Sequence, residues 1–506
     1  MKIFRLFSVF LAFGLSACGD FLNEQSQDLT YAASCEDLNE ILIGNGYMFH
    51  RPIASFAMNN TNCYYPWIHV MDDDFEEFSY TSFFGQFMAR NADNLKSFYC
   101  WEKMAFQDQG NTIQDYEWER LYHHISALNV IIKEVDNFPD DPEVLRNKVR
   151  GEALFLRAGY YWLLANFYAA PYEKDKADKT LGIPLKLTEY IEDKIFHRAT
   201  LDSVYLQIIE DLQNAGKHLK DITQPSVYRA NQSAVHALLG RVYLYMGEWQ
   251  KAVNACEQVE KKYSMLDLNN FNNKTDFLSS ASPETIFIQG VSIMTSMFSR
   301  DQGTVSYRIS QDLLEIYDKD VDLRYKYFFR RRREDKQVCC VKILDTETKN
   351  ATGSDVFIIR YPEVLLNKAE ALVMLGKEET AIDVLKELLA KRYPPQKVPD
   401  ITFKGEKLIN YIRDERRREL CCEGHRWFDL RRYAVSVKYP YKKTIRHNVY
   451  ERNTGKKGYG DKIGYYELLP YPEGKGWILP IPDYELEMSG TAMLPNERED
   501  AKFYEL

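Results

Sequence analysis

A helical spacing of apolar residues runs through most of the chain beyond residue 115. Apolar side chains return every three to four positions, the period of a helix with one buried face. Four helix pairs can be placed, at about 115–168, 201–263, 357–393 and 408–433, and the second pair consists of helices over 201–219 and 233–263. Because an apolar stripe has to be covered by a neighbouring element, the pairs are expected to stack. The pattern predicts a mainly α fold.

Two segments also carry a spacing typical of tetratricopeptide repeats. Gly-x-x-x-x-Ala occurs from Gly247 to Ala252 and again from Gly376 to Ala381, and Gly240 lies seven residues before the first of these. Small residues let two helices approach closely, and a glycine opens the turn between them. We therefore expect tetratricopeptide-like packing of about four helix pairs.

The rest of the chain lacks this period. Residues 31–114 and 264–356 combine short helical or strand patterns, such as a predicted strand at Thr285–Gln289, with aromatic-rich loops. Residues 440–506 are rich in Tyr, Gly and Pro and are predicted to be loops. Residues 31–506 are thus expected to form a single body, with a helical part and an irregular, loop-rich part.

The first residues have the pattern of an export signal. Lys2 and Arg5 surround the start of an apolar run that ends at Leu15-Ser16-Ala17-Cys18. This pattern resembles the bacterial lipoprotein signal, in which the cysteine is acylated. We therefore expect a signal peptide at 1–17, lipidation such as palmitate at Cys18, and a tether over 18–30. An ordinary secreted protein with a cysteine at this position by chance is the alternative.

The net charge of −9 argues against nucleic acid as a partner. Most of the nine cysteines are expected to be small buried hydrophobes, with disulfides left open. No cofactor is predicted. The acidic run Asp72-Asp73-Asp74-Phe75-Glu76-Glu77 is consistent with a structural calcium site, but a solvated face is the favoured interpretation.

A charged motif spans residues 412–432. Glu415 and Glu419 are one helical turn apart, and Arg416, Arg426 and Asp429 are expected to form an ion-pair network between two helices. Glu415, Glu419 and Asp429 also offer carboxylates for catalysis. Adjacent arginines lower the pKa of such groups, which suits a general acid poorly, so a structural role is favoured.

This motif resembles the C-terminal signature of the SusD/RagB family of Bacteroidota outer-membrane lipoproteins. Further blocks resemble the family in the same order, at 150–161, 314–329, 359–371 and 477–482. The matching positions in the two motifs are Arg150, Glu152, Arg157, Glu415, Arg416, Glu419, Gly424, Arg426, Trp427 and Asp429. Cys421-Cys422 is unusual within the signature.

The resemblance implies a lipid-anchored protein without catalytic activity, exposed on the outer membrane. Such proteins capture a glycan or peptide and deliver it to a SusC-type TonB-dependent transporter. The helix pairs would face the transporter, and the irregular regions would hold the ligand, most simply an oligosaccharide.

Sugars stack their C–H faces on aromatic rings, so aromatic residues in loops are the predicted contacts. These are Tyr64, Tyr65, Trp67, Trp101, Phe298 and Tyr307, and for each ring taken alone a place in the core is the favoured alternative. Two other classes remain open: an exported tetratricopeptide scaffold and a surface glycoside hydrolase, which would need a carboxylate pair that no motif marks. The ligand's identity is not encoded in any local motif.

Overall fold

The computed structural model describes residues 32–49, 64–78, 80–81, 95–108, 111–112, 114–259, 262–292, 307–333, 336–343, 353–451 and 458–506. The predicted signal peptide at 1–17, Cys18 and the tether at 18–30 lie outside these residues. Within the described residues, no helix has both the length and the apolar character needed to span a membrane.

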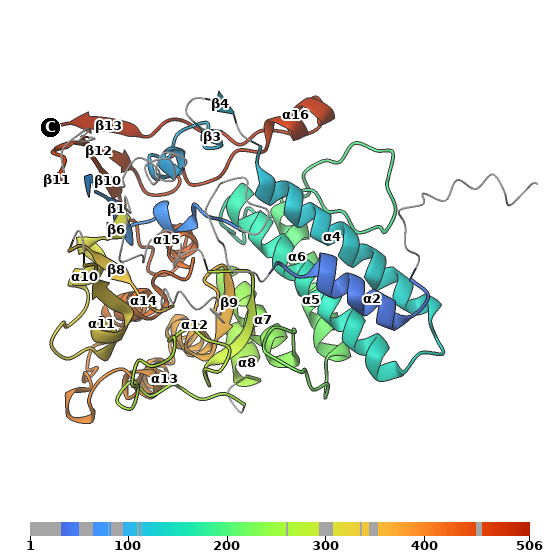
Figure 1. Ribbon diagram of the computed structural model, residues 1–506, viewed down its shortest axis with the longest axis horizontal. Helices are drawn as coiled ribbons and strands as arrows, with labels where there is room; N and C mark the ends of the chain where they lie inside the picture. The colour runs from blue at the N-terminus through green and yellow to red at the C-terminus, as the bar shows by residue number, and fades with distance from the viewer. Residues whose placement is uncertain are drawn as a thin grey trace, which may run out of the picture.

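Helices are the main regular elements of the molecule (Figure 1). Each helix of the array packs on the one before it, from α4 through α5, α6, α7, α8 and α12 to α13, and α14 packs on α12. Their bounds are α2 Cys35–Ile41, α4 Tyr116–Glu134, α5 Glu143–Tyr168, α6 Leu201–His218, α7 Gln232–Tyr245, α8 Trp249–Glu257, α12 Tyr361–Met374, α13 Glu378–Leu389, α14 Glu406–Leu420 and α15 Arg426–Ala434. Shorter helices are α10 Gln311–Glu315, α11 Leu323–Phe328 and α16 Asp483–Ser489. The predicted mainly α fold is confirmed.

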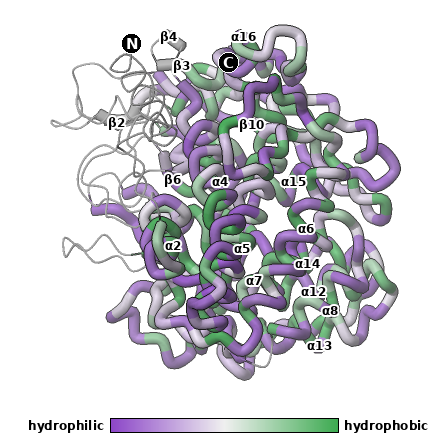
Figure 2. Tube along the Cα trace, turned by 90° about the vertical axis from the view of Figure 1, so that its right-hand side faces the viewer, coloured by the Kyte–Doolittle hydropathy of each residue, from purple (hydrophilic) through white to green (hydrophobic). Residues whose placement is uncertain are grey.

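Hydrophilic and hydrophobic residues alternate along α2 and α4 (Figure 2), whereas α5 is buried on all sides from Gly151 to Tyr168. The alternation in α2 and α4 is the pattern expected of helices that bury one face and expose the other. The periodicity of the sequence is therefore expressed in the packing.

The helices turn at the glycines that the repeat spacing marked. Gly247, between α7 and α8, has φ 73°, and Gly376, between α12 and α13, has φ 77°. Residues with a Cβ adopt this left-handed conformation only at a cost. The prediction of one helix over 233–263 is wrong, because the chain reverses at Gly247. A Cβ added at Gly240 would lie 2.9 Å from Cys256 Sγ, which confirms the predicted close approach of the two helices.

Several of the small antiparallel sheets lie at the end of the molecule opposite α2, α4 and α5 (Figure 1). One sheet has the order β10-β12-β13, and β1 pairs with β6 beside it. The strands are β1 Phe75–Glu77, β6 Tyr307–Ile309, β10 Ile445–Tyr450, β12 Lys462–Leu468 and β13 Lys502–Glu505. The other pairs are β2 Tyr80–Thr81 with β11 Gly458–Tyr459, β3 Gln107–Asp108 with β4 Asn111–Thr112, β5 Thr285–Gln289 with β9 Phe357–Arg360, and β7 Phe329–Arg331 with β8 Val338–Cys340.

The strand predicted at Thr285–Gln289 is confirmed as β5. The prediction that residues 440–506 are loops is wrong, because this region supplies β10, β12, β13 and α16. Its Gly, Pro and Tyr content hid the strands. The alternation of buried and exposed residues in β10 is the signal that would have identified one of them.

Candidate functional site

The aromatic residues predicted to meet a ligand lie in the core. Their exposed fractions are 1% for Tyr64, Tyr65, Trp67 and Trp101 and 3% for Tyr307. The alternative that places each of these five rings in the core is therefore confirmed, and the expectation of exposed rings is wrong. Phe298 lies outside the described residues. A ring without an exposed face has no surface on which a sugar could stack.

These rings hold the N-terminal segment against the helices. The Tyr64 hydroxyl lies 2.8 Å from His124 Nε2 on α4. The rings of Tyr65 and Phe167 are stacked with centroids 4.7 Å apart, and Trp67 stacks on Phe98 at 4.9 Å. The sequence showed aromatic loops but not the elements that cover them.

Tyr307 and its neighbour Arg308 show that adjacent residues of β6 lie on opposite faces, one buried and one on the surface. The Tyr307 ring packs inward against Tyr99, with centroids 5.4 Å apart. Successive side chains of a strand point to opposite faces. The next residue, Arg308, is the one on the outer face, where its Nε donates to Glu76 Oε1 at 2.9 Å.

Cross-strand pairing places a set of polar and aromatic side chains on this outer face. Arg308 lies opposite Glu76, Tyr465 lies between Asn448 and Tyr504, and Glu467 lies between Arg446 and Lys502. Directly opposed residues share a face of the sheet. We call this set the sheet face, which consists of Glu76, Arg308, Arg446, Asn448, Tyr450, Lys462, Tyr465, Glu467, Lys502 and Tyr504.

Two hydrogen bonds join the two sheets that carry the sheet face, the β1–β6 pair and the β10-β12-β13 sheet. Asn448 Nδ2 donates to Glu76 Oε2 at 3.4 Å, and Arg308 Nη2 donates to the Tyr450 hydroxyl at 3.4 Å. Arg308 Nη1 also donates to Gln337 Oε1 at 2.7 Å, beside β8. The polar surface is therefore continuous from β13 to β8.

A stacked tyrosine pair forms the centre of the β12–β13 part. The half-buried rings of Tyr465 and Tyr504 lie 5.1 Å apart with an interplanar angle of 11°. The Arg446 guanidinium lies 5.3 Å from the Tyr465 centroid, and the Tyr504 hydroxyl donates to Glu467 Oε1 at 3.3 Å. Apolar ring edges, hydroxyls and charged groups thus lie within one surface.

Packed aromatic residues support the sheet face from behind. His447 on β10 is 1% exposed, and its ring lies 4.1 Å from both the Tyr99 and the Trp101 ring. Trp101 Nε1 donates to the Met71 carbonyl at 2.9 Å. Trp101 therefore lies beneath the sheet face and is not part of its surface. Its contacts hold β10, the strand that carries Arg446 and Asn448.

Two cavities lie elsewhere. One of about 450 Å³ lies between the end of α6 and the start of α7, with Tyr263 in its lining. The other, of about 400 Å³, lies behind β12 and is lined by Tyr466, Glu102 and Asp500. Each has one tyrosine, whereas the sheet face has a stacked pair together with charged groups on both sides.

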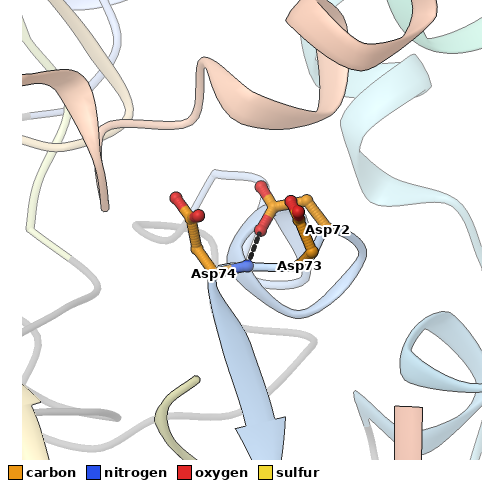
Figure 3. A group of neighbouring side chains, drawn as sticks. All are labelled: Asp72, Asp73 and Asp74. Carbon is orange, nitrogen blue, oxygen red and sulfur yellow. Dashed lines mark hydrogen bonds between the residues drawn. The ribbon is translucent and has the colours of Figure 1, made fainter. Parts of the chain in front are cut away.

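The acidic run Asp72–Asp74 is buried, so the prediction that it forms a solvated face is wrong (Figure 3). One oxygen of each carboxylate lies within 4.8 Å of the others, a spacing that could hold a metal ion. Both oxygens of Asp73 bond Arg426, at 2.7 and 2.8 Å, and Asp74 Oδ1 accepts from Arg417 at 2.8 Å. Because side-chain cations already bond these oxygens, the arrangement favours an ion-pair network over a calcium site.

Asp72 differs from its two neighbours. Its Oδ1 accepts a bond from the Asp74 backbone N–H at 2.9 Å (Figure 3). Burial, followed by the charges of Asp74 and Asp73, raises its pKa well above the ordinary value. A protonated Asp72 reduces the negative charge that Arg417 and Arg426 have to balance.

The C-terminal signature forms a second buried network around α14. Glu419 accepts from Arg392 Nε at 2.8 Å and from Arg360 Nη1 at 3.1 Å, and Glu415 accepts from Arg324 at 2.5 Å. Burial opposes the ionisation of both glutamates, but the arginines outweigh it and hold each pKa below its ordinary value. The predicted effect on these carboxylates is confirmed, and it suits a general acid poorly.

The predicted link between α14 and α15 is confirmed for one pair. Arg416 Nε donates to Asp429 Oδ2 at 2.7 Å. Arg426 instead reaches Asp73 in the N-terminal segment, a partner that spacing along the motif could not reveal. Trp427 stacks on Trp477 at 4.5 Å, and Gly424 has φ 73° with Ile68 against it.

The α5 motif residues are also structural. Arg157 donates to both oxygens of Asp211, at 2.8 and 2.6 Å. Glu152 is fully buried and accepts from Arg229 Nε at 2.5 Å. Arg150 forms an ion pair with Asp136 at 2.5 Å. Both motifs therefore hold helices and segments together, and the sheet face lies outside them.

Three sequence profiles match the chain. A SusD family profile covers residues 327–496, and a profile described as starch-binding, associating with the outer membrane, covers residues 66–244. A tetratricopeptide repeat profile covers residues 238–264, the region of α7 and α8. Together they reach both the helical array and the strands.

Two similar proteins occur in Formosa agariphila. SusD-like protein P38 of Formosa agariphila is 23% identical over 384 residues, covering 63% of this chain and 72% of that protein. SusD-like protein P2 of the same species is 26% identical over 438 residues, covering 75% and 79%.

Solved structures share the fold. A SusD superfamily protein of Bacteroides thetaiotaomicron has a TM-score of 0.70 at 22% identity, covering 92% of this chain and 100% of that one. A SusD-like carbohydrate binding protein of Bacteroides vulgatus has a TM-score of 0.65 at 19% identity, covering 91% and 97%. With the two profiles and both motif networks in place, the chain belongs to the SusD/RagB family.

Proposed function

We propose that this protein binds a carbohydrate at the cell surface and passes it to a SusC-type TonB-dependent transporter in the outer membrane. Membership of the family supports this assignment, as do a profile described as starch-binding and a structural neighbour described as carbohydrate binding. The observation in this chain that carries the proposal is the sheet face with its stacked pair Tyr465–Tyr504.

The sheet face has the chemistry that an oligosaccharide requires. Tyrosine rings supply apolar edges for C–H groups, and the hydroxyls, amide and charged groups nearby supply donors and acceptors for sugar hydroxyls. The face also extends across several strands, which suits a chain of sugar units better than a small enclosed molecule. We therefore place the ligand on the sheet face.

Polysaccharide affinity electrophoresis tests this placement. We expect at least one neutral or charged polysaccharide to retard the protein, and the variant Tyr465→Ala/Tyr504→Ala to lose at least tenfold in affinity. Tyr466→Ala is the matched control, because Tyr466 is the adjacent residue on β12 but lies on the opposite face, against Phe503 at 5.0 Å. Retained binding in the double variant, or equal loss in the control, contradicts the placement.

The anchor and the transporter complete the proposal. A lipid on Cys18, followed by the tether over 18–30, would hold the body beside the transporter and raise the effective concentration of each for the other. The first helices of the array, α4, α5 and α6, lie at the opposite end from the sheet face, and the helical array is the proposed transporter side (Figure 1). Cys18→Ala should leave the fold intact and release the protein from membranes, and retention in the membrane fraction contradicts the anchor.

We propose binding without catalysis. Glu415, Glu419 and Asp429 are bound by arginines, and each pKa lies below its ordinary value. Hydrolysis of any panel polysaccharide by the purified protein would favour a glycoside hydrolase. If the protein binds none of the polysaccharides, the result would favour a tetratricopeptide scaffold, for which α7 and α8 supply the repeat.

A further inference from the structure

The sheet face carries more positive than negative charge. Four of its members are cationic, Arg308, Arg446, Lys462 and Lys502, and two are acidic, Glu76 and Glu467. The chain as a whole has a formal net charge of −9. The positive excess is therefore a local property of this surface.

Both acids of the sheet face already have a partner. Arg308 pairs with Glu76 at 2.9 Å, and Arg446 pairs with Glu467 at 2.8 Å. The two lysines remain. Among the residues that the structure describes, neither Lys462 nor Lys502 forms an ion pair with a carboxylate, and each instead lies against a tyrosine.

Register places the two lysines on either side of the Tyr465–Tyr504 row, because Lys502 lies opposite Glu467 and Lys462 lies opposite Tyr450. Lys462 Nζ is 5.6 Å from the Tyr465 centroid, and the Arg446 guanidinium, in the row of Lys502, is 5.3 Å from it. Lys502 Nζ is 4.5 Å from the Tyr504 centroid. A sugar placed on the edges of the two rings would thus have a cationic group on either side. Long lysine side chains can reach a ligand while their stems cover the rings.

The acid next to the tyrosine pair on β13 lies on the other face. Glu505 follows Tyr504, and adjacent residues of a strand point to opposite sides, so Glu505 is directed away from the tyrosine pair. Exposed lysines without a carboxylate partner are available to an anionic ligand at little desolvation cost.

We propose that the ligand of the sheet face is an anionic glycan, one that carries carboxylate or sulfate groups. The inference rests on the proposed function and narrows it to a substrate class. Charge-assisted bonds from Lys462, Lys502 and Arg446 would hold the acid groups, while Tyr465 and Tyr504 contact the sugar rings.

Matched pairs of probes test the charge directly. Polygalacturonate is compared with its fully methyl-esterified form, and dextran sulfate with dextran, so that the members of each pair share a sugar backbone and differ in whether it carries acid groups. We expect the protein to bind one charged polymer at least tenfold more tightly than its neutral counterpart, with an affinity that falls as salt is added. The carboxylate and sulfate arms show which acid group is recognised.

Variants locate the effect. Lys462→Ala/Lys502→Ala should lower the affinity for the preferred polymer at least tenfold, while Lys386→Ala/Lys407→Ala, which removes two exposed lysines from α13 and α14, leaves it unchanged. Equal loss in both variants overturns the inference.

The two proposals fail differently. If the protein binds neutral polysaccharides without preferring a charged partner, the anionic class is wrong and glycan binding stands. If it binds no polysaccharide of either kind, carbohydrate binding itself is contradicted.

Discussion

The charges around α14 and the charges on the sheet face use the same residue types in opposite ways. Glu415 and Glu419 are fully buried and each is bound by more than one arginine. Arg446, by contrast, has a side chain that is 63% exposed and a single carboxylate partner. Buried ion pairs fix one arrangement of segments, whereas exposed pairs contribute little to stability and can exchange partners. The comparison separates residues that hold the fold from residues free to bind.

Removal of one partner from the buried network should have the largest effect. Glu419→Ala leaves Arg392 and Arg360 buried without their carboxylate, which costs about 3–5 kcal/mol of unfolding free energy. Chemical denaturation monitored by circular dichroism measures this change. Asp414→Ala is the matched control, because Asp414 is exposed on the same helix and its loss should cost under about 0.5 kcal/mol. Similar values for the two variants would contradict the structural role of the network.

A second buried carboxylate, Asp115, sharpens the comparison, because no arginine among the residues that the structure describes forms a hydrogen bond or ion pair with it. Asp115 caps α4, accepting from the backbone N–H groups of Glu117 and Trp118, and burial raises its pKa to about 7. The folded pKa lies above the unfolded value of about 3.9, so the protonated form is favoured by folding. The contribution of this group to stability is therefore highest below about pH 4 and falls as pH rises to about 7.

The variant Asp115→Asn tests whether the contribution of Asp115 to stability falls as pH rises. Asparagine keeps the cap but does not ionise, so the variant should gain about 1–3 kcal/mol over the wild type at pH 8 and nothing at pH 4. Denaturation curves at the two pH values provide the measurement. For Glu419 we expect the opposite dependence on pH. Because its pKa is lowered, its contribution to the free energy of unfolding disappears as pH falls. A gain for Asp115→Asn that is equal at both pH values would contradict this account.

The exposed pair should have the smallest effect on stability. Arg446→Ala removes one ion pair with Glu467 and one contact with Tyr465, and we expect a loss of under about 1 kcal/mol. The same variant should weaken ligand binding severalfold, as measured by isothermal titration calorimetry. A stability loss as large as that of Glu419→Ala would place Arg446 among the structural charges and remove it from the binding surface.

Features that depend on neighbouring residues could be predicted from the sequence, whereas contacts between distant segments could not. Helical periods and turn glycines are local patterns, so the helix pairs and the reversals at Gly247 and Gly376 were within reach. The Arg416–Asp429 link was predictable because both residues lie in one motif. The bond from Arg426 to Asp73 was not, because it joins segments that only the fold brings together.

Most of the candidate site could not be predicted from local sequence patterns. Composition drew attention to Trp67 and Trp101, but whether a loop aromatic is exposed depends on which elements pack over it. The sheet face depends on register between strands far apart in the chain, and a step of one residue exchanges Tyr307 for Arg308. The alternation of Ile445–Tyr450 was a usable signal for β10, although its partners β12 and β13 were not predictable from it.

The central claim is that the sheet face, and neither cavity, receives the carbohydrate. A crystal structure with the oligosaccharide form of the most strongly bound polysaccharide tests it most directly. We predict sugar rings against Tyr465 and Tyr504, with Arg446 or a flanking lysine in hydrogen-bond contact. A sugar seated instead beside Tyr263 at the start of α7, or beside Tyr466 and Glu102 behind β12, would contradict the account.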